Sequence, residues 1–285
     1  MPPIALALLI VAAGLHAGWN VLVKHAKEKQ IFTWWALIVG SVGFAPVLLI
    51  SQPFPSQIWP YVFFSALFEG TYYIMLTRAY QYGDFSLVYP IARGMAPAFL
   101  VIWALLFLGE RPRLAGYIGL ALLIIGLVII GGKKWWSLRK ITTVSTSGIA
   151  LALSVACCIS IYSAIDGAAV RLVAAVPYTL VVISLSAIFI TPLILMRYGP
   201  RATIIEWRAN WPRIAVVGVL MLLSYTLVLQ SYTLARVSYA GAVREISVVF
   251  AALIGWRWLG EEFGLWRAIG ASVIFTGILL IAIAG

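Results

Sequence analysis

The chain has 285 residues, of which 63% are hydrophobic and 10% charged, and its formal net charge is +11. A soluble globular domain carries about 25% charged residues, so this composition excludes an ordinary soluble protein. A basic balance can indicate nucleic-acid binding. Basic residues placed between long apolar segments indicate a membrane protein instead.

Apolar segments long enough to cross a bilayer recur along the whole chain. A bilayer core about 30 Å thick takes roughly 20 apolar residues in a helix, and only helices satisfy their backbone polar groups within lipid. The polar connections at 132–147 and 197–213 are too short for a soluble domain. The sequence therefore predicts an all-α integral membrane protein with ten transmembrane helices, at 3–23, 31–50, 59–82, 86–108, 114–131, 148–169, 175–196, 214–235, 238–259 and 264–284.

The basic residues fall unequally on the two sides of these helices. About 14 of the 20 Lys and Arg residues lie on the side that carries the loop from the first helix to the second, about four lie on the other side, and two lie within spans. Because basic loops stay in the cytoplasm, we expect both termini outside a bacterial inner membrane. The net charge is then an orientation signal, and no nucleic-acid partner is expected.

The second half of the sequence repeats features of the first at an offset of about 151 residues. The matched features are Leu108-Gly109-Glu110 with Leu259-Gly260-Glu261, Arg93 with Arg244, Phe99 with Phe250, Gly119 with Gly270, and Gly126 with Gly277. We predict five-helix repeats at 1–132 and 148–285, joined by a basic loop at 133–147. An odd number of helices inverts the second repeat in the membrane, which suits alternating access around a central cavity.

These features, together with His16-Ala17-Gly18-Trp19-Asn20 and Tyr89-Pro90-Ile91-Ala92-Arg93-Gly94-Met95-Ala96-Pro97, resemble the EamA-type members of the drug/metabolite transporter superfamily. The resemblance covers essentially the whole chain. It implies secondary transport, in many bacterial members export of amino acids or related metabolites, through a cavity between the halves. Such proteins are often described with cytoplasmic termini, whereas the basic residues of this chain favour the reverse.

Two arginines lie inside predicted spans, where an ionisable residue needs a partner or a function. Arg93 could bind a substrate carboxylate with its planar guanidinium, or it could form a structural ion pair with Glu69 or with Glu245. Arg244 occupies the equivalent position in the second repeat. Neighbouring helical positions point about 100° apart, so Arg244 and Glu245 are not expected to face the same way.

Other polar residues within spans are candidates for the same cavity. Glu69, followed one turn later by Tyr72, could bind an amine, carry a proton or neutralise an arginine. His16, Trp19 and Asn20 share one helix face; Trp19 is expected to line the cavity, and His16 to form an interhelical hydrogen bond. Asp166, near the end of its span, is expected to be solvated.

Two prolines and two glutamates receive different interpretations. Pro90 and Pro97 flank Arg93, and proline removes a helical hydrogen bond, so we expect a kink or unwound backbone that could serve as a hinge. Glu110 and Glu261 lie at helix exits and are expected to be turn and salt-bridge residues outside the binding site.

The chain shows no phosphate-binding loop, metal-ligand pattern or nucleophile–base pair, so we expect no enzyme, cofactor or metal. The leading hypothesis is a secondary exporter of small metabolites, chiefly amino acids, with the lipid bilayer as its other partner. Arg93 would bind the carboxylate and Glu69 or Glu245 the amine. Trp19, Tyr72, Tyr162 and Trp103 would contact the side chain, and Arg244, His16 and Asn20 would complete the site. Carriers of cationic drugs or phosphorylated metabolites and, more remotely, a membrane enzyme or lipid-handling scaffold remain alternatives. Proton coupling, facilitated diffusion and the oligomeric state are all left open.

Overall fold

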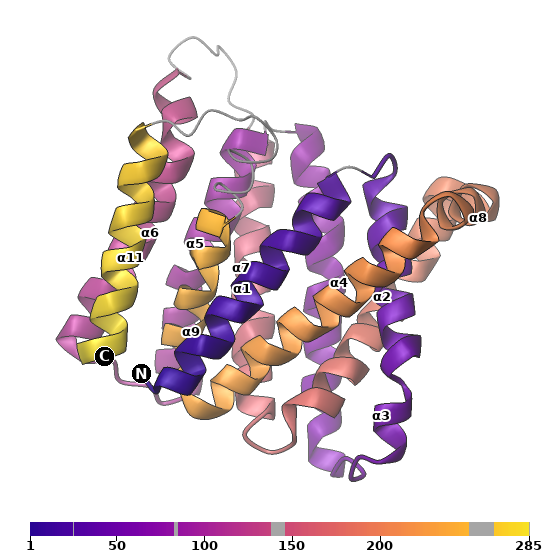
Figure 1. Cartoon of the computed structure of the whole chain (residues 1–285), viewed down its shortest axis with the longest axis horizontal. Helices are drawn as coiled ribbons and strands as arrows, with labels where there is room; N and C mark the ends of the chain where they lie inside the picture. The colour runs from indigo at the N-terminus through magenta and orange to yellow at the C-terminus, as the bar shows by residue number, and fades with distance from the viewer. Residues whose placement is uncertain (25, 83–84, 138–145, 251–264, 285) are drawn as a thin grey trace.

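The computed structural model describes residues 1–24, 26–82, 85–137, 146–250 and 265–284, and every regular element in these ranges is a helix (Figure 1). The predicted all-α class is therefore confirmed for this part of the chain. The elements are α1 (Pro3–Lys24), α2 (Lys29–Phe44), α3 (Pro46–Leu49), η1 (Ser56–Ile58), α4 (Trp59–Tyr82), α5 (Phe85–Phe107), α6 (Leu114–Ser137), α7 (Thr146–Ala169), α8 (Ala175–Leu234), α9 (Val237–Val243), η3 (Arg244–Ile246) and α11 (Leu265–Ala284).

The outer surface of the bundle is apolar. Four of the described helical stretches are long and apolar enough to cross a membrane, and shorter apolar stretches lie in α5, α6 and α11. Large apolar side chains such as Leu49, Met196 and Ile283 are more than four-fifths exposed. Soluble monomers rarely expose large contiguous apolar surfaces, so this surface is suited to lipid. The long stretches are Pro3–Val23, Lys29–Leu49, Ala150–Ala169 and Ala175–Leu234.

The prediction of a polar loop at 197–213 is wrong, because this stretch is helical. The long helix α8 is interrupted only at Gly199, whose φ of 73° and ψ of 160° lie outside the helical region. Glycine tolerates this positive φ, and Pro200 then occupies the first turn of the next limb, where its missing N–H costs nothing. Trp35 Nε1 in α2 donates to the carbonyl oxygen of Thr203 at 2.9 Å. The two limbs of α8 meet in an elbow at Gly199. In Figure 1 the helical turns beside this elbow are seen nearly end-on at the edge of the bundle, so they run across the other helices.

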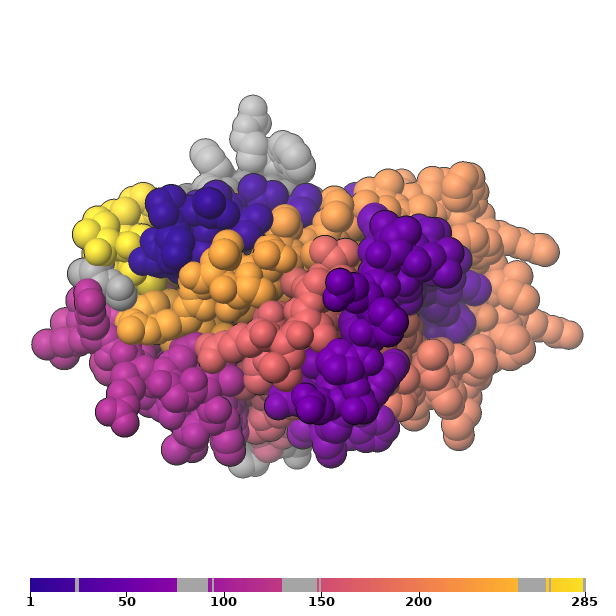
Figure 2. Space-filling view, turned by 90° about the horizontal axis from the view of Figure 1, so that it is seen from below, coloured from indigo at the N-terminus to yellow at the C-terminus, as the bar shows by residue number. Residues whose placement is uncertain are grey.

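Both termini lie at one end of the bundle (Figure 1). The N-terminal ammonium of Met1 donates a hydrogen bond of 3.0 Å to the carbonyl oxygen of Ala282 in α11. Figure 2 looks onto this end and shows α1 lying against the second limb of α8. The two termini therefore lie at the same end of the bundle, and the side of the membrane on which they lie stays a prediction.

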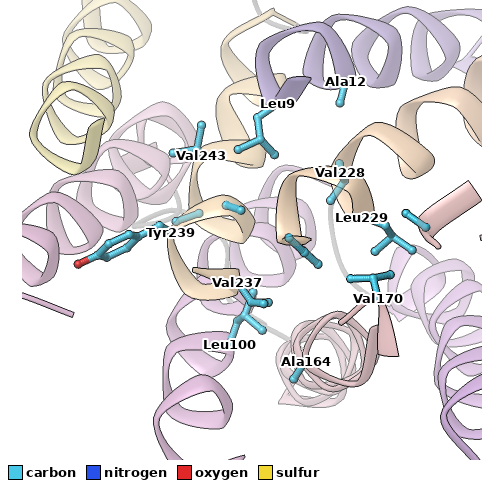
Figure 3. Packing of buried hydrophobic residues seen from close by; sticks show 14 of the residues in the cluster. Leu9, Ala12, Leu100, Ala164, Val170, Val228, Leu229, Val237, Tyr239 and Val243 are labelled. Carbon is cyan, nitrogen blue, oxygen red and sulfur yellow. The ribbon is translucent and has the colours of Figure 1, made fainter. Parts of the chain in front are cut away.

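Helices from the two halves of the chain share one apolar core (Figure 3). Leu9 and Ala12 of α1 belong to the same buried cluster as Val228 and Leu229 of α8 and Val243 of α9. The first helix of the chain thus packs mainly on helices from the second half. This interdigitation brings α1, α5 and the segment after α9 together around one centre.

Glycines let α6 and α11 approach to backbone contact. A Cβ atom added to Gly119 would lie 2.8 Å from the carbonyl oxygen of Gly277, and one added to Gly126 would lie 2.8 Å from that of Gly270. Small residues allow such close packing of membrane helices. The contacts are crosswise: Gly119 meets the sequence counterpart of Gly126, and Gly126 meets the sequence counterpart of Gly119.

Substituting these glycines should destabilise the protein. In Gly119→Ala and Gly277→Ala the new Cβ would lie 2.8 and 2.7 Å from a backbone oxygen, and overpacking of this kind costs about 1–3 kcal/mol. We expect a lower melting temperature for purified protein in detergent. At Gly14 an added Cβ meets nothing within 4 Å, so Gly14→Ala is the matched control and should melt like the wild type. Equal destabilisation by all three substitutions would contradict the packing argument.

Candidate functional site

A buried carboxylate between two arginines forms the centre of the candidate site. Glu245 is fully buried, and its Oε1 lies 3.4 Å from Arg93 Nη1 and 3.7 Å from Arg244 Nε. Arg93 comes from α5 in the first half of the chain, whereas Arg244 and Glu245 form the η3 turn in the second. Of the partners predicted for Arg93, the structure selects Glu245. The ion pair therefore joins the two halves of the chain.

The expectation that Arg244 and Glu245 point apart is wrong. Residues 244–246 form a turn of 3₁₀ helix, and the flexible arginine side chain brings its Nε within ion-pair distance of the neighbouring carboxylate. Glu245 Oε2 and Arg244 Nε form no hydrogen bond within the described ranges. Buried polar atoms are normally hydrogen-bonded, so this centre has capacity for a further polar ligand.

His16 brings α1 to the same centre. Its Nε2 lies 2.6 Å from Arg93 Nη2. Because a guanidinium can only donate, Nε2 must accept, and the imidazole is neutral. This is an interhelical hydrogen bond of the kind expected of His16. Trp19 packs edge-on against the His16 ring with a centroid separation of 4.8 Å, so it lies beside the charged centre.

Two further carboxylates are buried near this centre. Glu69 in α4 accepts a hydrogen bond of 2.8 Å from Ser186. Asp166 in α7 was expected to be solvated, yet it is fully buried and accepts hydrogen bonds from Tyr178, at 2.7 Å, and from Tyr225. Within the described ranges, neither Glu69 nor Asp166 forms an ion pair. The expectation for Asp166 failed because sequence places a residue near a span end without showing whether another helix covers it.

A row of tyrosines leads from α4, the helix that carries Glu69, to Asp166. The rings of Tyr72 and Tyr162 are 6.2 Å apart, and those of Tyr162 and Tyr225 are 6.3 Å apart. Tyr225 in turn donates to Asp166. Tyr72 and Tyr162 are among the predicted site residues. Tyr225 is not, although its hydroxyl group inside an apolar span was the available signal.

Two other predicted residues form hydrogen bonds that do not include Arg93, Arg244 or Glu245. Asn20 is exposed and donates to the carbonyl oxygen of His16 within its own helix at 2.7 Å. Trp103 donates to Ser160 at 2.9 Å; it follows Arg93 by ten residues, about 15 Å along a helix. The helix α5 stays α-helical through Pro90 and Pro97, so the predicted unwinding is wrong, and a hinge role stays a prediction.

The remaining expectations concern Glu110, Glu261 and metal ions. Glu110 is buried and pairs with Arg171 at 3.6 Å, and Glu261 lies outside the described residues. In the ranges that the structure describes, no group of three His, Cys, Asp or Glu residues could hold a metal ion.

A helical bundle with an apolar outer surface and buried charges at its centre is a multi-pass membrane protein. Intramembrane charges of this kind mark substrate or ion pathways in such proteins. The chain belongs to the EamA-like transporter family, which matches residues 3–132 and again residues 146–283. The family expected from the sequence motifs is therefore confirmed, with two copies of its repeat.

Individual relatives are more distant. The pseudopaline exporter CntI of Pseudomonas aeruginosa, from two strains, is 27% identical over 197 residues, which cover 67% of this chain and 61% of the exporter. The alignment thus spans less than two thirds of that relative. One crystal structure of a protein aligns over 99% of this chain and 98% of its own with a TM-score of 0.73. At 18% identity, it shows a shared fold alone.

Breaking the central ion pair should destabilise the protein strongly. Glu245→Ala would leave Arg93 buried without its carboxylate partner, and removing one member of a buried pair costs about 3–5 kcal/mol. The measurement is the melting temperature of purified protein. Arg171 also pairs with a glutamate, but its side chain is 46% exposed. Arg171→Ala should therefore cost only about 0–1 kcal/mol. Equal losses in the two variants would show that burial does not set the strength of these pairs.

Proposed function

We propose that this protein is a secondary transporter that exports small metabolites bearing a carboxylate and an amine, amino acids or closely similar compounds. The observation that carries the proposal is the pair of arginines around Glu245. Two guanidinium groups share the one carboxylate of Glu245, so a substrate carboxylate would provide a second anion for them. Membership of a transporter family supports transport, and the exporter among its relatives supports the outward direction.

The amine of such a substrate would face the buried carboxylates. Glu69 is buried and forms no ion pair in the described ranges. A zwitterion would place its carboxylate at the arginines and its amine at Glu69. Tyr72 and Tyr162 lie together in the same region, and their rings would contact the side chain of the substrate.

Alternating access between two inverted halves is the mechanism that we propose. The two family matches and the crosswise contacts of Gly119 and Gly126 with Gly277 and Gly270 support a twofold relation between the halves. The helices α6 and α11 run antiparallel at these contacts, as inversion requires. An ion pair between the halves would have to rearrange when one half moves against the other.

Transport can be measured directly. Liposomes containing the purified protein and an unlabelled amino acid should take up the same labelled amino acid by counterflow. Arg93→Ala should abolish this exchange, because a substrate carboxylate would lose its charged partner. Arg171→Ala, a change in an exposed arginine outside the site, should exchange at a rate close to wild type. A wild-type protein that exchanges no amino acid of a broad panel would refute the proposed substrate class.

A carrier of organic cations is the second candidate, and Glu69 and Asp166 favour it because both are buried without an ion pair in the described structure. Decarboxylated amines separate the two proposals. An amino-acid carrier should not transport them, whereas a cation carrier should transport them even after Arg93→Ala and should lose them after Glu69→Gln. A phosphorylated substrate would require both arginines and tolerate Glu69→Gln.

The proposed orientation places both termini outside the cell. In a background of Cys157→Ser and Cys158→Ser, Pro2→Cys should react with a membrane-impermeant maleimide on intact cells. Arg201→Cys, at the α8 elbow on the side predicted to be cytoplasmic, should react only after lysis; both native side chains are exposed. The opposite labelling pattern would invert the topology.

A further inference from the structure

The end of α5 turns back sharply at the first copy of the repeated Leu-Gly-Glu motif. Gly109 has a φ of 64°, in the left-handed region that favours glycine. The N–H of Glu110 returns to the carbonyl oxygen of Ala104 at 3.1 Å. This turn directs the Glu110 side chain into the protein, and only 6% of the surface of this residue is exposed.

The carboxylate of Glu110 holds the first turn of α9. Its Oε1 accepts from the N–H of Val237 at 2.5 Å, and its Oε2 accepts from the N–H and the hydroxyl of Ser238 at 3.1 and 2.6 Å. Free N–H groups at the start of a helix favour a negative charge. The substrate site does not use these contacts, and they join the two halves of the chain.

The same corner contains a second inter-half contact. The hydroxyl of Tyr239 accepts from the N–H of Arg113 at 3.3 Å. Gly116 leaves room for this ring, since a Cβ there would lie within 2.8 Å of Tyr239 Cε1. The consecutive residues 237–239 at the start of α9 are therefore hydrogen-bonded to the connection between α5 and α6, which contains Glu110 and Arg113.

The segment that is held in this way continues into η3, which carries Arg244 and Glu245. Every residue from Val237 to Glu245 is buried. Ser238 precedes Arg244 by six residues, about 9 Å along a helix. A shift at the start of α9 would consequently move Arg244 and Glu245 relative to Arg93.

We propose that Glu110 is a positioning residue: by holding the first turn of α9, it sets the place of Arg244 and Glu245 in the substrate site. The expected effect of Glu110 on substrate binding rests on the proposed function, whereas its expected effect on the position of Glu245 does not. Loss of the Glu110 charge weakens all three hydrogen bonds and lets the segment from Val237 to Glu245 move. Glu69, which lies on α4, stays in place.

Double-mutant cycles test this role. The variants are Glu110→Gln, Glu245→Gln and Glu69→Gln, alone and with Glu110→Gln in pairs, and both the melting temperature and the half-saturation concentration for counterflow are measured. Contacting or mechanically linked residues give non-additive effects, whereas independent sites add. We expect Glu110→Gln and Glu245→Gln to be non-additive in both measurements, and Glu110→Gln and Glu69→Gln to be additive in both.

Single variants give the expected sizes. Glu110→Gln should raise the half-saturation concentration about tenfold, as for loss of a charged hydrogen bond. Ser238→Ala, which removes one of the three bonds, should raise it about threefold and tests the proposal if Glu110→Gln does not fold. Arg171→Ala removes the ion pair between Glu110 and the half-exposed Arg171 side chain but none of the three hydrogen bonds to α9. It should change the half-saturation concentration less than about twofold.

The outcomes separate this assignment from the proposed function. Additivity of Glu110→Gln with Glu245→Gln in melting temperature overturns the positioning role, whatever the protein transports. Non-additive melting together with no counterflow by the wild type supports the positioning of Glu245 and refutes the substrate class. An effect of Arg171→Ala equal to that of Glu110→Gln would show that the ion pair, and not the hold on α9, is what matters.

Discussion

A guanidinium buried within a membrane protein needs a negative partner, and here that partner comes from the other half of the chain. Charges at bilayer depth cost several kcal/mol unless they are paired. Arg93 meets this demand through Glu245, with His16 on its other side. The pair requires α1, α5 and the η3 turn to lie together, so much of the bundle is arranged around it.

The centre differs physically from the contacts that surround it. Where α6 meets α11, glycine backbones touch and leave no space for a side chain, let alone for a ligand. The same is true where α2 meets α8: a Cβ added to Gly40 would lie 2.8 Å from the carbonyl oxygen of Gly218, and one added to Gly218 would lie 2.5 Å from that of Ala36. These contacts hold helices at fixed separations. In the polar centre, by contrast, atoms such as Glu245 Oε2 form no hydrogen bond with the residues that the structure describes, and it is here that a ligand can add interactions.

Sequence was informative where a single residue conflicts with its surroundings. An arginine or a glutamate inside an apolar span is conspicuous, and Arg93, Glu69 and Glu245 were selected for that reason. Apolar periodicity does not report which helices meet, so the choice between Glu69 and Glu245 as the partner of Arg93 needed coordinates. Asp166 was misjudged because burial near a span end depends on helices far away in sequence.

Backbone turns were also difficult to predict. The stretch 197–213 carries enough arginine to suggest a loop, yet Asn210 donates to Glu206 one turn away and its exposed arginines form a solvated helix face. Glu110 was correctly placed at a helix exit. Its contacts with Val237 and Ser238 depend on a neighbour more than a hundred residues away, which spacing alone does not reveal.

The contact between Met1 and Ala282 has a consequence for how the chain could be rearranged. Because Met1 donates to the carbonyl oxygen of Ala282 in the last turn of α11, the start of α1 and the end of α11 are adjacent. A short linker could close them, and a new start could be opened in the connection between α6 and α7, which would exchange the order of the two family repeats without displacing a helix. Circularly permuted proteins of this kind retain their contacts when the old termini are close. The order in which the repeats are translated is thus not dictated by the geometry of the finished bundle.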